Sequence, residues 1–353
     1  MHPHFLRETS DTICVPLTII LNKSLTSGIL PNTWKCANIT PIHKKGAKNL
    51  PANYRPISLT SVIGKILESI VRDKLVDHCM LYNLFSDAQH GFVPGRSCMT
   101  QLLTVMEDWT LALDNSHSID SVYLDFQKAF DTVPHQRLLH KLSAYGVGRS
   151  LRDWLQNFLT ERSQCVGLNG MTSTSIAVKS GIPQGSVLGP ILFVLYINDL
   201  PRSIRSIVKI FADDTKIYRS VDDEAGRNIL QQDLDTLNNW SETWQLKFNK
   251  SKCKVIHFGN NNEQFNYTMG DHPLISDNYE KDLGIIIDNE LKFHEHISVA
   301  VKKSSKMLGL IKHTFSCLDE DTVPILFKTM VRPHLEYGNI IWHPRFKLDE
   351  IKI

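Results

Sequence analysis

Two adjacent carboxylates, Asp213 and Asp214, are the residues of this chain best placed to do chemistry. They stand between two apolar segments, 207–211 and 215–218, so the pattern predicts a β-hairpin with acid at its turn. Hard divalent cations such as Mg2+ prefer carboxylate oxygens, and the mouth of a hairpin holds such oxygens on a stiff support. Aspartate is also a common turn residue, so an ordinary solvated turn remains an alternative for this pair taken alone.

A third carboxylate, Asp125, stands at the end of a mostly apolar segment, 121–125, which predicts a buried strand. A helix is expected soon after it. Pro134 suits the first turn of that helix, and apolar residues recur after it with helical spacing. Gly146 is placed to end the helix. Asp125 therefore lies at a strand end, although it could also serve only as the cap of the following helix.

The three carboxylates together predict a two-metal site. Strand ends carrying Asp125 and Asp213 can meet side by side in one sheet, with Asp214 next to them. Such a trio can hold two ions roughly 3.5–4 Å apart, the arrangement that serves in-line phosphoryl and nucleotidyl transfer. One ion would lower the pKa of an attacking hydroxyl, and the other would neutralise the leaving phosphates.

Residues 180–186 form a loop punctuated by glycine and proline, which leads into the apolar run 187–197. Its glycines allow another molecule to approach the backbone closely, as a nucleotide or a template strand would require. An ordinary loop before a core helix is the alternative. The apolar run is well short of the roughly 20 residues needed to span a bilayer, so we expect no membrane partner.

These stretches, in their order along the chain, resemble motifs A, B and C of reverse transcriptases: residues 125–131, 181–185 and 211–214. More narrowly, the chain resembles the polymerase of a non-LTR (LINE-type) retrotransposon of the jockey-like sort. Further stretches resemble the fingers motifs, motif D and motif E of the family, and they are residues 41–46, 53–59, 89–97, 246–252 and 283–288. The resemblance runs from about residue 25 to the end, and an ordered series of motifs is far more specific than any one of them.

The resemblance implies an α+β right-hand polymerase fold, with fingers, a palm built on an antiparallel sheet, and a partial helical thumb. We expect an N-terminal lead at 1–22 and a reverse transcriptase domain at 23–288. Within that domain the fingers would occupy about 23–120 and the palm about 121–288. The partial thumb would occupy 289–353, where the pattern turns helical and lysine-rich.

The resemblance also implies roles for the acids and for one lysine. Asp125, Asp213 and Asp214 match the catalytic, metal-binding carboxylates of the family. Lys252 matches the motif D lysine proposed to protonate the pyrophosphate leaving group, a general-acid role. Other lysines lie two positions away on either side, so the choice among the three stays open.

Six residues match nucleotide-binding positions of the family: Lys44, Lys45, Arg55, Phe130, Gln184 and Gly185. The basic fingers positions would grip the triphosphate, and a guanidinium fork suits phosphate oxygens. Phe130 matches the aromatic position that lies under the incoming sugar and blocks a 2′-hydroxyl. Gln184 and Gly185 match the loop beneath the template-primer and the nucleotide.

Motif E departs from its usual form. Many relatives carry an aromatic residue before its Leu-Gly pair, whereas here Glu280, Lys281 and Asp282 precede Leu283. The contact of this hairpin with the primer is therefore not expected in the usual detail.

The resemblance implies two Mg2+ ions as cofactors, with Mn2+ as an alternative. The implied partners are an RNA template, a DNA primer and deoxynucleoside triphosphates. The sequence does not indicate an oligomeric state. A full element of this type resembles an endonuclease followed by a polymerase, and the residues before about 25 leave no room for an endonuclease, so we expect a polymerase fragment or a truncated genomic copy.

Composition is consistent with this interpretation. The 353 residues, 42% of them apolar, are enough for a sizeable core. A net charge of +2 does not by itself indicate a nucleic-acid binder. Lysines nevertheless cluster at 44–48, 247–254 and 302–312, and local basic patches are what backbone neutralisation requires.

Cysteine usage predicts the compartment. The seven cysteines show no CxxC pairing, which fits reduced thiols inside a cell, and the N-terminus lacks a signal-peptide pattern. We therefore expect an intracellular protein, in the nucleus, the cytoplasm or both. His294 and His296 are spaced i, i+2 rather than the i, i+4 of helical metal sites, so we expect no metal there.

Three other functions compete with reverse transcription. A truncated chain can fold and bind nucleic acid without catalysis. The same palm chemistry can copy RNA into RNA, although Phe130 argues against that. A metal phosphohydrolase can use the same carboxylates, but it leaves the fingers motifs without an explanation.

Overall fold

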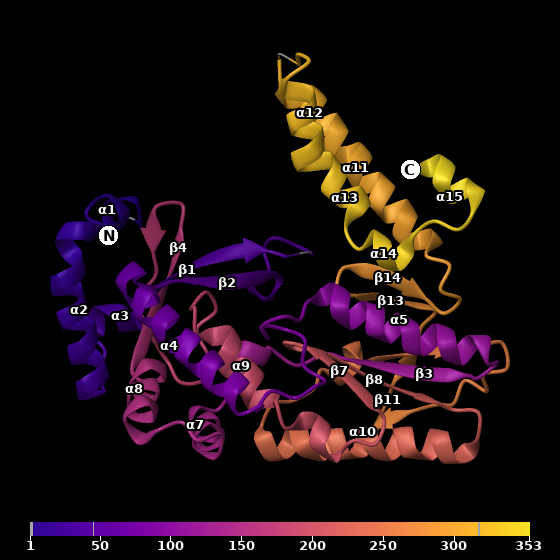
Figure 1. Cartoon of the computed structure of the whole chain (residues 1–353), viewed down its shortest axis with the longest axis horizontal. Coiled ribbons are helices and arrows are strands. Elements are labelled where there is room, and N and C mark those ends of the chain that lie inside the picture. The colour runs from indigo at the N-terminus through magenta and orange to yellow at the C-terminus, as the bar shows by residue number, and fades with distance from the viewer. Residues whose placement is uncertain (1–2, 45, 317) are drawn as a thin grey trace.

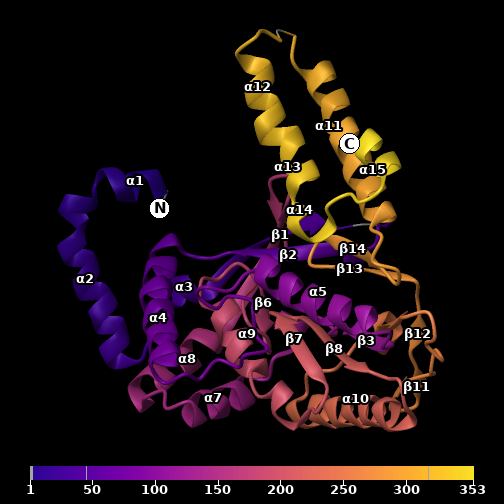
Figure 2. The same ribbon diagram turned by 45° about the vertical axis from the view of Figure 1, so that its right-hand side comes forward.

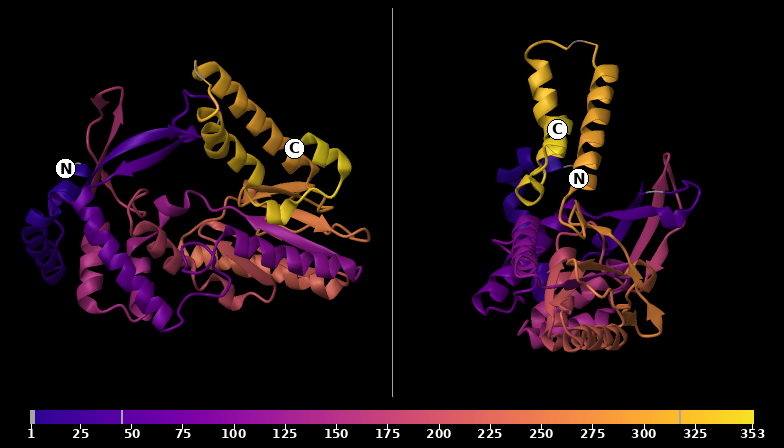
Figure 3. Two further views of the ribbon diagram at one scale, coloured as in Figure 1. Left: turned by 45° about the horizontal axis from the view of Figure 1, so that its top comes forward. Right: turned by 90° about the vertical axis from the view of Figure 1, so that its right-hand side faces the viewer.

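The computed structural model describes residues 3–44, 46–316 and 318–353. Figure 1 shows the N-terminal elements at one end of the molecule, a layered centre of sheet and helices, and a helical C-terminal arm. The mixed α+β class is therefore as predicted. The other views confirm that the arm projects away from the layered centre (Figures 2 and 3).

The first sheet lies in the N-terminal part and has the strand order β2-β1-β4-β5, with β6 also paired to β4. Its strands are β1 (Cys36–His43), β2 (Tyr54–Leu59), β4 (Arg162–Leu168), β5 (Met171–Thr172) and β6 (Ile176–Val178). β1 and β2 pair antiparallel from Asn38↔Leu59 to His43↔Tyr54. They form a hairpin whose connecting segment begins at Lys44.

All but one of the helices in the first 203 residues lie in the N-terminal part of the molecule or beside its centre (Figure 1). They are α1 (Pro3–Glu8), α2 (Ser10–Ser27), α3 (Asn32–Lys35), η1 (Pro51–Asn53), α4 (Val62–Leu81), α6 (Ala129–Thr132), α7 (His135–Ala144), α8 (Arg149–Leu159), α9 (Gly189–Ile197) and η2 (Leu200–Ser203). α7 is the helix predicted after Pro134, and Gly146 beyond its end has a φ of +80°. α9 is buried on all sides, as predicted for a core helix. The expected domain boundary at residue 22 lies within α2.

The second sheet forms the centre and has the strand order β12-β9-β3-β8-β7. Its strands are β3 (Ile119–Leu124), β7 (Ile207–Phe211), β8 (Asp214–Ser220), β9 (Lys254–Phe258) and β12 (Ile275–Ser276). β3 pairs antiparallel with both β8 and β9, and β7 pairs antiparallel with β8. The predicted hairpin at 207–218 and the predicted strand before Asp125 are thus both confirmed.

Helices cover both faces of this sheet. Figures 1 and 2 show α5 (Cys98–Asp114) on one side of it and α10 (Glu224–Trp244) on the other. The α10 face buries leucines at helical spacing, Leu230, Leu234 and Leu237, against strand residues such as Ile217. The α5 face buries Trp109 among other apolar side chains. Because side chains alternate between the two faces of a strand, β3, β8 and β9 contribute apolar residues both to the core under α10 and to the core under α5.

The C-terminal part begins with small strands and ends in helices. Its elements are η3 (Lys250–Lys252), β10 (Thr268–Met269), β11 (His272–Pro273), β13 (Tyr279–Asp282), β14 (Ile285–Asp288), α11 (His294–Thr314), α12 (Thr322–Leu326), the π-helix η4 (Phe327–Val331), α13 (Arg332–Glu336), α14 (Asn339–Trp342) and α15 (Lys347–Lys352). The right-hand view of Figure 3 shows α11 and the following helices running side by side as a hairpin of helices. In the described part of the chain, no helix combines the length and apolar character needed to cross a bilayer.

Candidate active site

The acidic turn connects β7 to β8 with two residues. Phe211 and Asp214 form the last pair of the hairpin, and Ala212 and Asp213 make the connection. Ala212 has a φ of +54°, in a region that residues with a side chain rarely adopt. Asp213 and Asp214 are both exposed, while the residues that flank them on the two strands are more buried. The turn therefore presents its two carboxylates at the edge of a rigid hairpin.

Asp125 lies beside this turn because its strand is the neighbour of β8. The pairing of β3 with β8 ends at Leu124↔Thr215, and the next residue on each strand is Asp125 and Asp214. The negative charge of Asp125 is among the causes that raise the pKa values of both Asp213 and Asp214. The structure thus brings together the three acids singled out by their spacing in the sequence.

The raised pKa values of Asp213 and Asp214 show that these carboxylates ionise less readily than free ones and would be stabilised by a nearby cation. Exclusion of solvent by the surrounding protein, followed by the charge of Asp213, raises the pKa of Asp214 to about 6. Partial burial is also the main cause that raises the pKa of Asp213, despite the exposure of its side chain. Like charges this close disfavour ionisation of one another, and a bound cation would relieve that cost.

The donor set fits a hard divalent ion, because it consists of carboxylate oxygens alone. Over residues 3–44, 46–316 and 318–353, no three His, Cys, Asp or Glu side chains are gathered tightly enough to hold an ion as they stand. Asp125 points instead towards a lysine. Metal binding therefore requires the carboxylates to turn towards one another, which side chains at an exposed hairpin mouth can do.

Lys252 is the motif D lysine that faces the acids. Its Nζ lies 3.3 Å from Oδ2 of Asp125, and its side chain is 64% exposed. Lys254 is held elsewhere, by Asp277 and Glu280. The Nζ of Lys250 lies next to Gly270. Of the three lysines between which the sequence could not choose, Lys252 alone is shown paired with Asp125.

The fingers cations approach the turn from the β1–β2 hairpin. Arg55 lies on β2 opposite Ile42, and Lys44 begins the connection, with its backbone N–H donating to Asn53 O at 2.8 Å. The positive charges of Arg55 and Lys44 both lower the pKa of Asp213, although burial outweighs them. Lys45, the remaining predicted cation, lies outside the described residues. The β1–β2 hairpin thus brings two of the predicted cations close enough to act on the acidic turn.

The loop predicted to lie under the substrate is fixed to β2. The backbone N–H of Ser58, on β2, donates to Gln184 O at 2.8 Å. A Cβ added to Gly185 would come within 2.7 Å of Ser58 O, and Gly185 has a φ of +102°. Only glycine fits this close approach without strain. The side chain of Gln184 donates from Nε2 to Oδ1 of Asp131 at 2.8 Å.

Phe130 lies in α6 and is bonded to the loop that carries Gln184 and Gly185. Its ring stacks on Phe193 of α9, with centroids 4.5 Å apart, and it is half-buried. Its carbonyl oxygen accepts from the backbone N–H of Ile182 at 2.7 Å. The ring is therefore partly packed into the core and partly exposed, which is compatible with the sugar contact predicted for it.

One residue at the site was not assigned a role from the sequence. Gln89 is fully buried, and its Oε1 accepts from the backbone N–H of Gly91 at 2.7 Å and of Ala212 at 3.1 Å. A Cβ on Gly91 would lie 2.5 Å from Ala212 N. The backbone N–H of His90 donates to Ile210 O at 2.8 Å. The segment after residue 88 therefore buttresses the acidic turn from behind. Its Gln-His-Gly sequence was the available signal, but the sequence does not show which backbone that glutamine meets.

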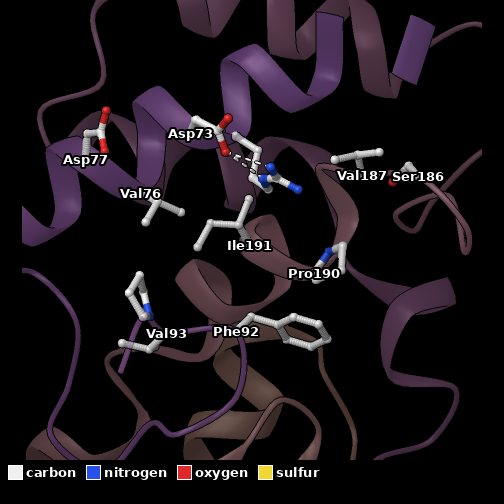
Figure 4. A pocket seen from close by; sticks show the side chains of 11 residues that line it. Asp73, Val76, Asp77, Phe92, Val93, Ser186, Val187, Pro190 and Ile191 are labelled. Carbon is white, nitrogen blue, oxygen red and sulfur yellow. Dashed lines mark hydrogen bonds and ion pairs between the residues drawn. The ribbon is translucent and has the colours of Figure 1, made fainter. Parts of the chain in front are cut away.

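A pocket of ≈ 630 Å³ opens beside this buttress, between α4, residues 92–94 and the start of α9. Figure 4 shows Phe92 and Pro190 on one side of it and Asp73 and Asp77 of α4 on the other. The pocket is not lined by Asp125, Asp213 or Asp214. It is adjacent to the candidate active site and separate from its chemistry.

The histidine pair at the start of α11 serves the fold. His294 bonds through Nδ1 to the buried carboxylate of Asp349. His296 is buried, and its Nδ1 accepts from the backbone N–H of Ile286 at 3.2 Å. Burial lowers the pKa of His296 to about 4, so it stays neutral as that acceptor role requires.

Comparison with known proteins agrees with this geometry. Residues 42–311 match the model of the family described as reverse transcriptase (RNA-dependent DNA polymerase). The chain is 30% identical to the RNA-directed DNA polymerase from mobile element jockey of Drosophila melanogaster, over 94% of this chain and 38% of the relative. It is 28% identical to the probable RNA-directed DNA polymerase from transposon X-element of the same species, over 92% of this chain and 37% of the relative.

The chain thus spans less than two fifths of the length of these relatives. Among solved structures it is similar to apo telomerase from Candida tropicalis, truncated from its C-terminal domain. That match has a TM-score of 0.51 and 10% identity, over 74% of this chain and 54% of the other. This likeness shows the fold alone, and it confirms the predicted right-hand arrangement. The predicted resemblance to jockey-like non-LTR retrotransposon polymerases is likewise confirmed, and the chain belongs to the reverse transcriptase family.

Proposed function

We propose that the protein is an RNA-directed DNA polymerase, which extends a DNA primer with deoxynucleotides copied from an RNA template during retrotransposition. The observation that carries this proposal is the position of Asp125 and of the Asp213-Asp214 turn on neighbouring antiparallel strands of one sheet. Arg55 and Lys44 act on Asp213 from the β1–β2 hairpin, and the Gln184 loop is bonded to β2 of that hairpin. A phosphohydrolase needs the acids but has no use for that second set.

In the proposed reaction the primer 3′-hydroxyl oxygen attacks the α-phosphorus of the nucleotide, and the bond to pyrophosphate breaks. The family uses divalent metal ions, and bound ions would make the hydroxyl more acidic and neutralise the phosphates. We assign two Mg2+ ions to Asp125, Asp213 and Asp214, with Mn2+ as an alternative. Lys252 is exposed beside Asp125, where it can give a proton to the leaving pyrophosphate.

The remaining residues would orient the substrates. Lys44 and Arg55 would bind the triphosphate, since their charges already act on Asp213. Phe130 would lie under the sugar and exclude a 2′-hydroxyl, with Phe193 holding its ring in place. Gln184 and Gly185 would support the template-primer from the loop that is fixed to Ser58.

The boundaries of fingers, palm and thumb given by the sequence are part of the same proposal. The fingers would include the β1–β2 hairpin, the palm the sheet that carries the acids, and the thumb α11 and the helices after it. We also propose an intracellular location, in the nucleus, the cytoplasm or both, where the RNA template and the target DNA are found.

Primer extension on poly-rA/oligo-dT tests the proposal. Wild-type protein should incorporate dTTP in the presence of Mg2+, and Asp125→Asn should abolish incorporation while the exposed-acid control Asp235→Asn retains it. Binding of the primer-template without incorporation would favour the inactive nucleic-acid-binding alternative. Equal use of ribonucleotides and deoxynucleotides by the wild type would contradict the role of Phe130 and favour an RNA-copying RNA polymerase.

A further inference from the structure

The β13–β14 hairpin joins the central sheet to the C-terminal helices. Its strands pair from Tyr279↔Asp288 to Asp282↔Ile285 and are closed by the two residues Leu283 and Gly284. These have φ values of +44° and +95°, and positive φ at both central residues is what a type I′ turn requires. Figure 2 shows this hairpin between α5 and the base of the helical arm. Its position therefore decides where the arm stands relative to the acids.

A buried ion pair holds the end of β13 against β8. Lys216 is 3% exposed and Asp282 is 6% exposed, and their side chains form an ion pair. Residues 214 and 216 lie on the same face of β8, because side chains alternate along a strand. Asp282 also lies close enough to Asp214 to contribute to its raised pKa. The pair is thus adjacent to the acidic turn and fully within the protein.

A second lysine holds the start of β13 against β9. Lys254 Nζ lies 2.9 Å from Oδ2 of Asp277 and 2.9 Å from Oε2 of Glu280. The hydrogen bonds to Glu280 and Asp277 raise the pKa of Lys254. All three side chains are half-buried, so this group is less costly to alter than the first. Together the two groups bind the hairpin to β8 and to β9, the two strands on either side of β3.

The other end of the hairpin is fixed to α11. Asp288, the last residue of β14, accepts through Oδ2 from Phe293 N at 2.6 Å and through Oδ1 from Lys292 N at 3.0 Å. His296 of α11 accepts from Ile286 N, as described above. The hairpin and the first turn of α11 therefore move as one piece, and whatever fixes the hairpin also fixes the helix.

We propose that Lys216, Asp282, Lys254, Asp277 and Glu280 form an ionic clamp that sets the position of the primer strand before the catalytic acids. The clamp residues are positioning residues: they fix the β13–β14 hairpin and α11 against the sheet that carries the acids, and they touch no substrate. That α11 lies along the primer is taken from the proposed function, in which α11 belongs to the thumb. The inference rests on the proposed polymerase function. It also accounts for the charged residues 280–282, which stand where many relatives carry an aromatic, since two of the three are clamp partners.

The test compares clamp variants in steady-state primer extension, with the KM for primer-template, the KM for dTTP and kcat measured separately. Lys254→Gln leaves the carboxylates of Asp277 and Glu280 without their cation, but both keep access to solvent. It should raise the KM for primer-template about threefold to tenfold, as expected for a partly exposed ion pair. The KM for dTTP should stay within about twofold, because the nucleotide contacts are untouched. The swapped pair Lys254→Glu with Glu280→Lys should recover most of the loss. Lys216→Met should have a larger effect, because it leaves Asp282 buried without its partner.

Lys35→Met is the matched control. Lys35 is 3% exposed and pairs with Glu161 Oε2 at 3.0 Å, far along the chain from the hairpin. It should leave the KM for primer-template unchanged. If Lys254→Gln and the control behave alike, or if the KM for dTTP changes instead, the clamp does not position the primer and the proposal is overturned.

Hydrogen exchange separates failure of the clamp from failure of the polymerase assignment. Amides of residues 279–296 should exchange faster in Lys254→Gln than in the wild type, with no change in the β7–β8 hairpin. If the wild type extends no primer, the polymerase function fails and the primer-positioning role falls with it. If the wild type extends primers but exchange in 279–296 is unaltered in the variant, the clamp itself is refuted.

Discussion

Two carboxylates, Asp120 and Asp125, lie at opposite ends of β3 in opposite environments. Asp120, near the start of the strand, is completely buried and accepts from His257 Nδ1 at 2.6 Å, Asn262 Nδ2 at 2.9 Å and Tyr267 OH at 2.7 Å. Asp125, just past its end, is 44% exposed and is paired with Lys252, whose side chain is 64% exposed. The fold supplies hydrogen-bond donors to the carboxylate of Asp120, whereas the carboxylate of Asp125 remains accessible to solvent.

The difference is the one expected between a structural acid and the acids proposed to bind metal. Buried charge is tolerated where the surrounding protein supplies enough donors, as it does for Asp120. At the turn, Asp213 and Asp214 have raised pKa values because burial and neighbouring acids act against ionisation. An arrangement that is costly for the free protein and is relieved by a cation is typical of a metal-dependent site.

The largest effect is expected from Asp213→Asn. The substitution removes a proposed metal ligand, and the loss of several kcal/mol of transition-state stabilisation corresponds to a fall of about 10³-fold in kcat. Stability should stay the same or rise slightly, since one source of repulsion at the turn is gone. Primer extension and urea unfolding of the same preparation measure both quantities. A large loss of stability with Asp213→Asn would mean that this acid is structural as well.

Asp120→Asn should behave in the opposite way. It replaces a buried acceptor of three hydrogen bonds with a group that also donates, so the free energy of unfolding should fall by about 2–4 kcal/mol. The activity of the molecules that remain folded should be close to that of the wild type. Urea denaturation gives the first quantity, and active-site titration with the primer-extension rate gives the second. An Asp120→Asn protein that is fully stable but inactive would break the comparison.

Gln89→Leu should affect the turn without removing a carboxylate. The change leaves the backbone N–H groups of Ala212 and Gly91 buried without an acceptor, at a cost of about 1–3 kcal/mol, or roughly tenfold in rate if it falls on the catalytic geometry. We expect kcat to fall while the KM for dTTP is unchanged. The conservative Gln89→Glu, which keeps the acceptor oxygen, should recover part of the rate. Equal kinetics for Gln89→Leu and wild type would show that the turn holds its shape unaided.

The smallest effect is expected from pH. The folded-state pKa of Asp214 is raised to about 6, so the folded protein binds this proton more tightly than the unfolded chain does. In the absence of divalent ions, ionisation of Asp214 should therefore lower stability as pH rises from about 4 to 6. After allowance for solvent screening, the effect is about 1 kcal/mol.

Asp214→Asn supplies the control for that pH effect, because it cannot ionise. Its stability relative to the wild type should increase between pH 4 and pH 6 and then level off. Addition of Mg2+ at pH 7 should reduce the difference in the free energy of unfolding between Asp214→Asn and the wild type, because Mg2+ stabilises the wild type alone. Parallel stability curves for the two proteins over this range would contradict the assigned pKa direction.

The sequence was sufficient for features that depend on local pattern. The β7–β8 hairpin, the strand before Asp125 and the helix after Pro134 were predicted because apolar spacing and turn residues act within a few positions. The meeting of Asp125 with the acidic turn followed from two strand ends and from the family resemblance. These elements include every carboxylate of the candidate site.

Contacts between distant segments were not predictable in the same way. The sequence around Lys250, Lys252 and Lys254 does not show which of them faces Asp125. The three lysines lie within η3 and at the start of β9, and a shift of two residues there would bring a different one to Asp125. Gln89 and Ala212 are 123 residues apart, and Lys216 and Asp282 are 66 apart. Such pairings depend on how the sheets and helices stack, and side-chain type alone does not specify that.

The most direct test of the central assignment is single-nucleotide incorporation on an RNA-templated primer, measured across a Mg2+ titration. The wild type should show a rate that rises with Mg2+ and saturates, and Asp120→Asn should show the same dependence per folded molecule. Asp213→Asn should show no comparable rate at any Mg2+ concentration. Incorporation by Asp213→Asn at the wild-type rate would contradict the assignment of the β7–β8 turn as the centre of nucleotidyl transfer.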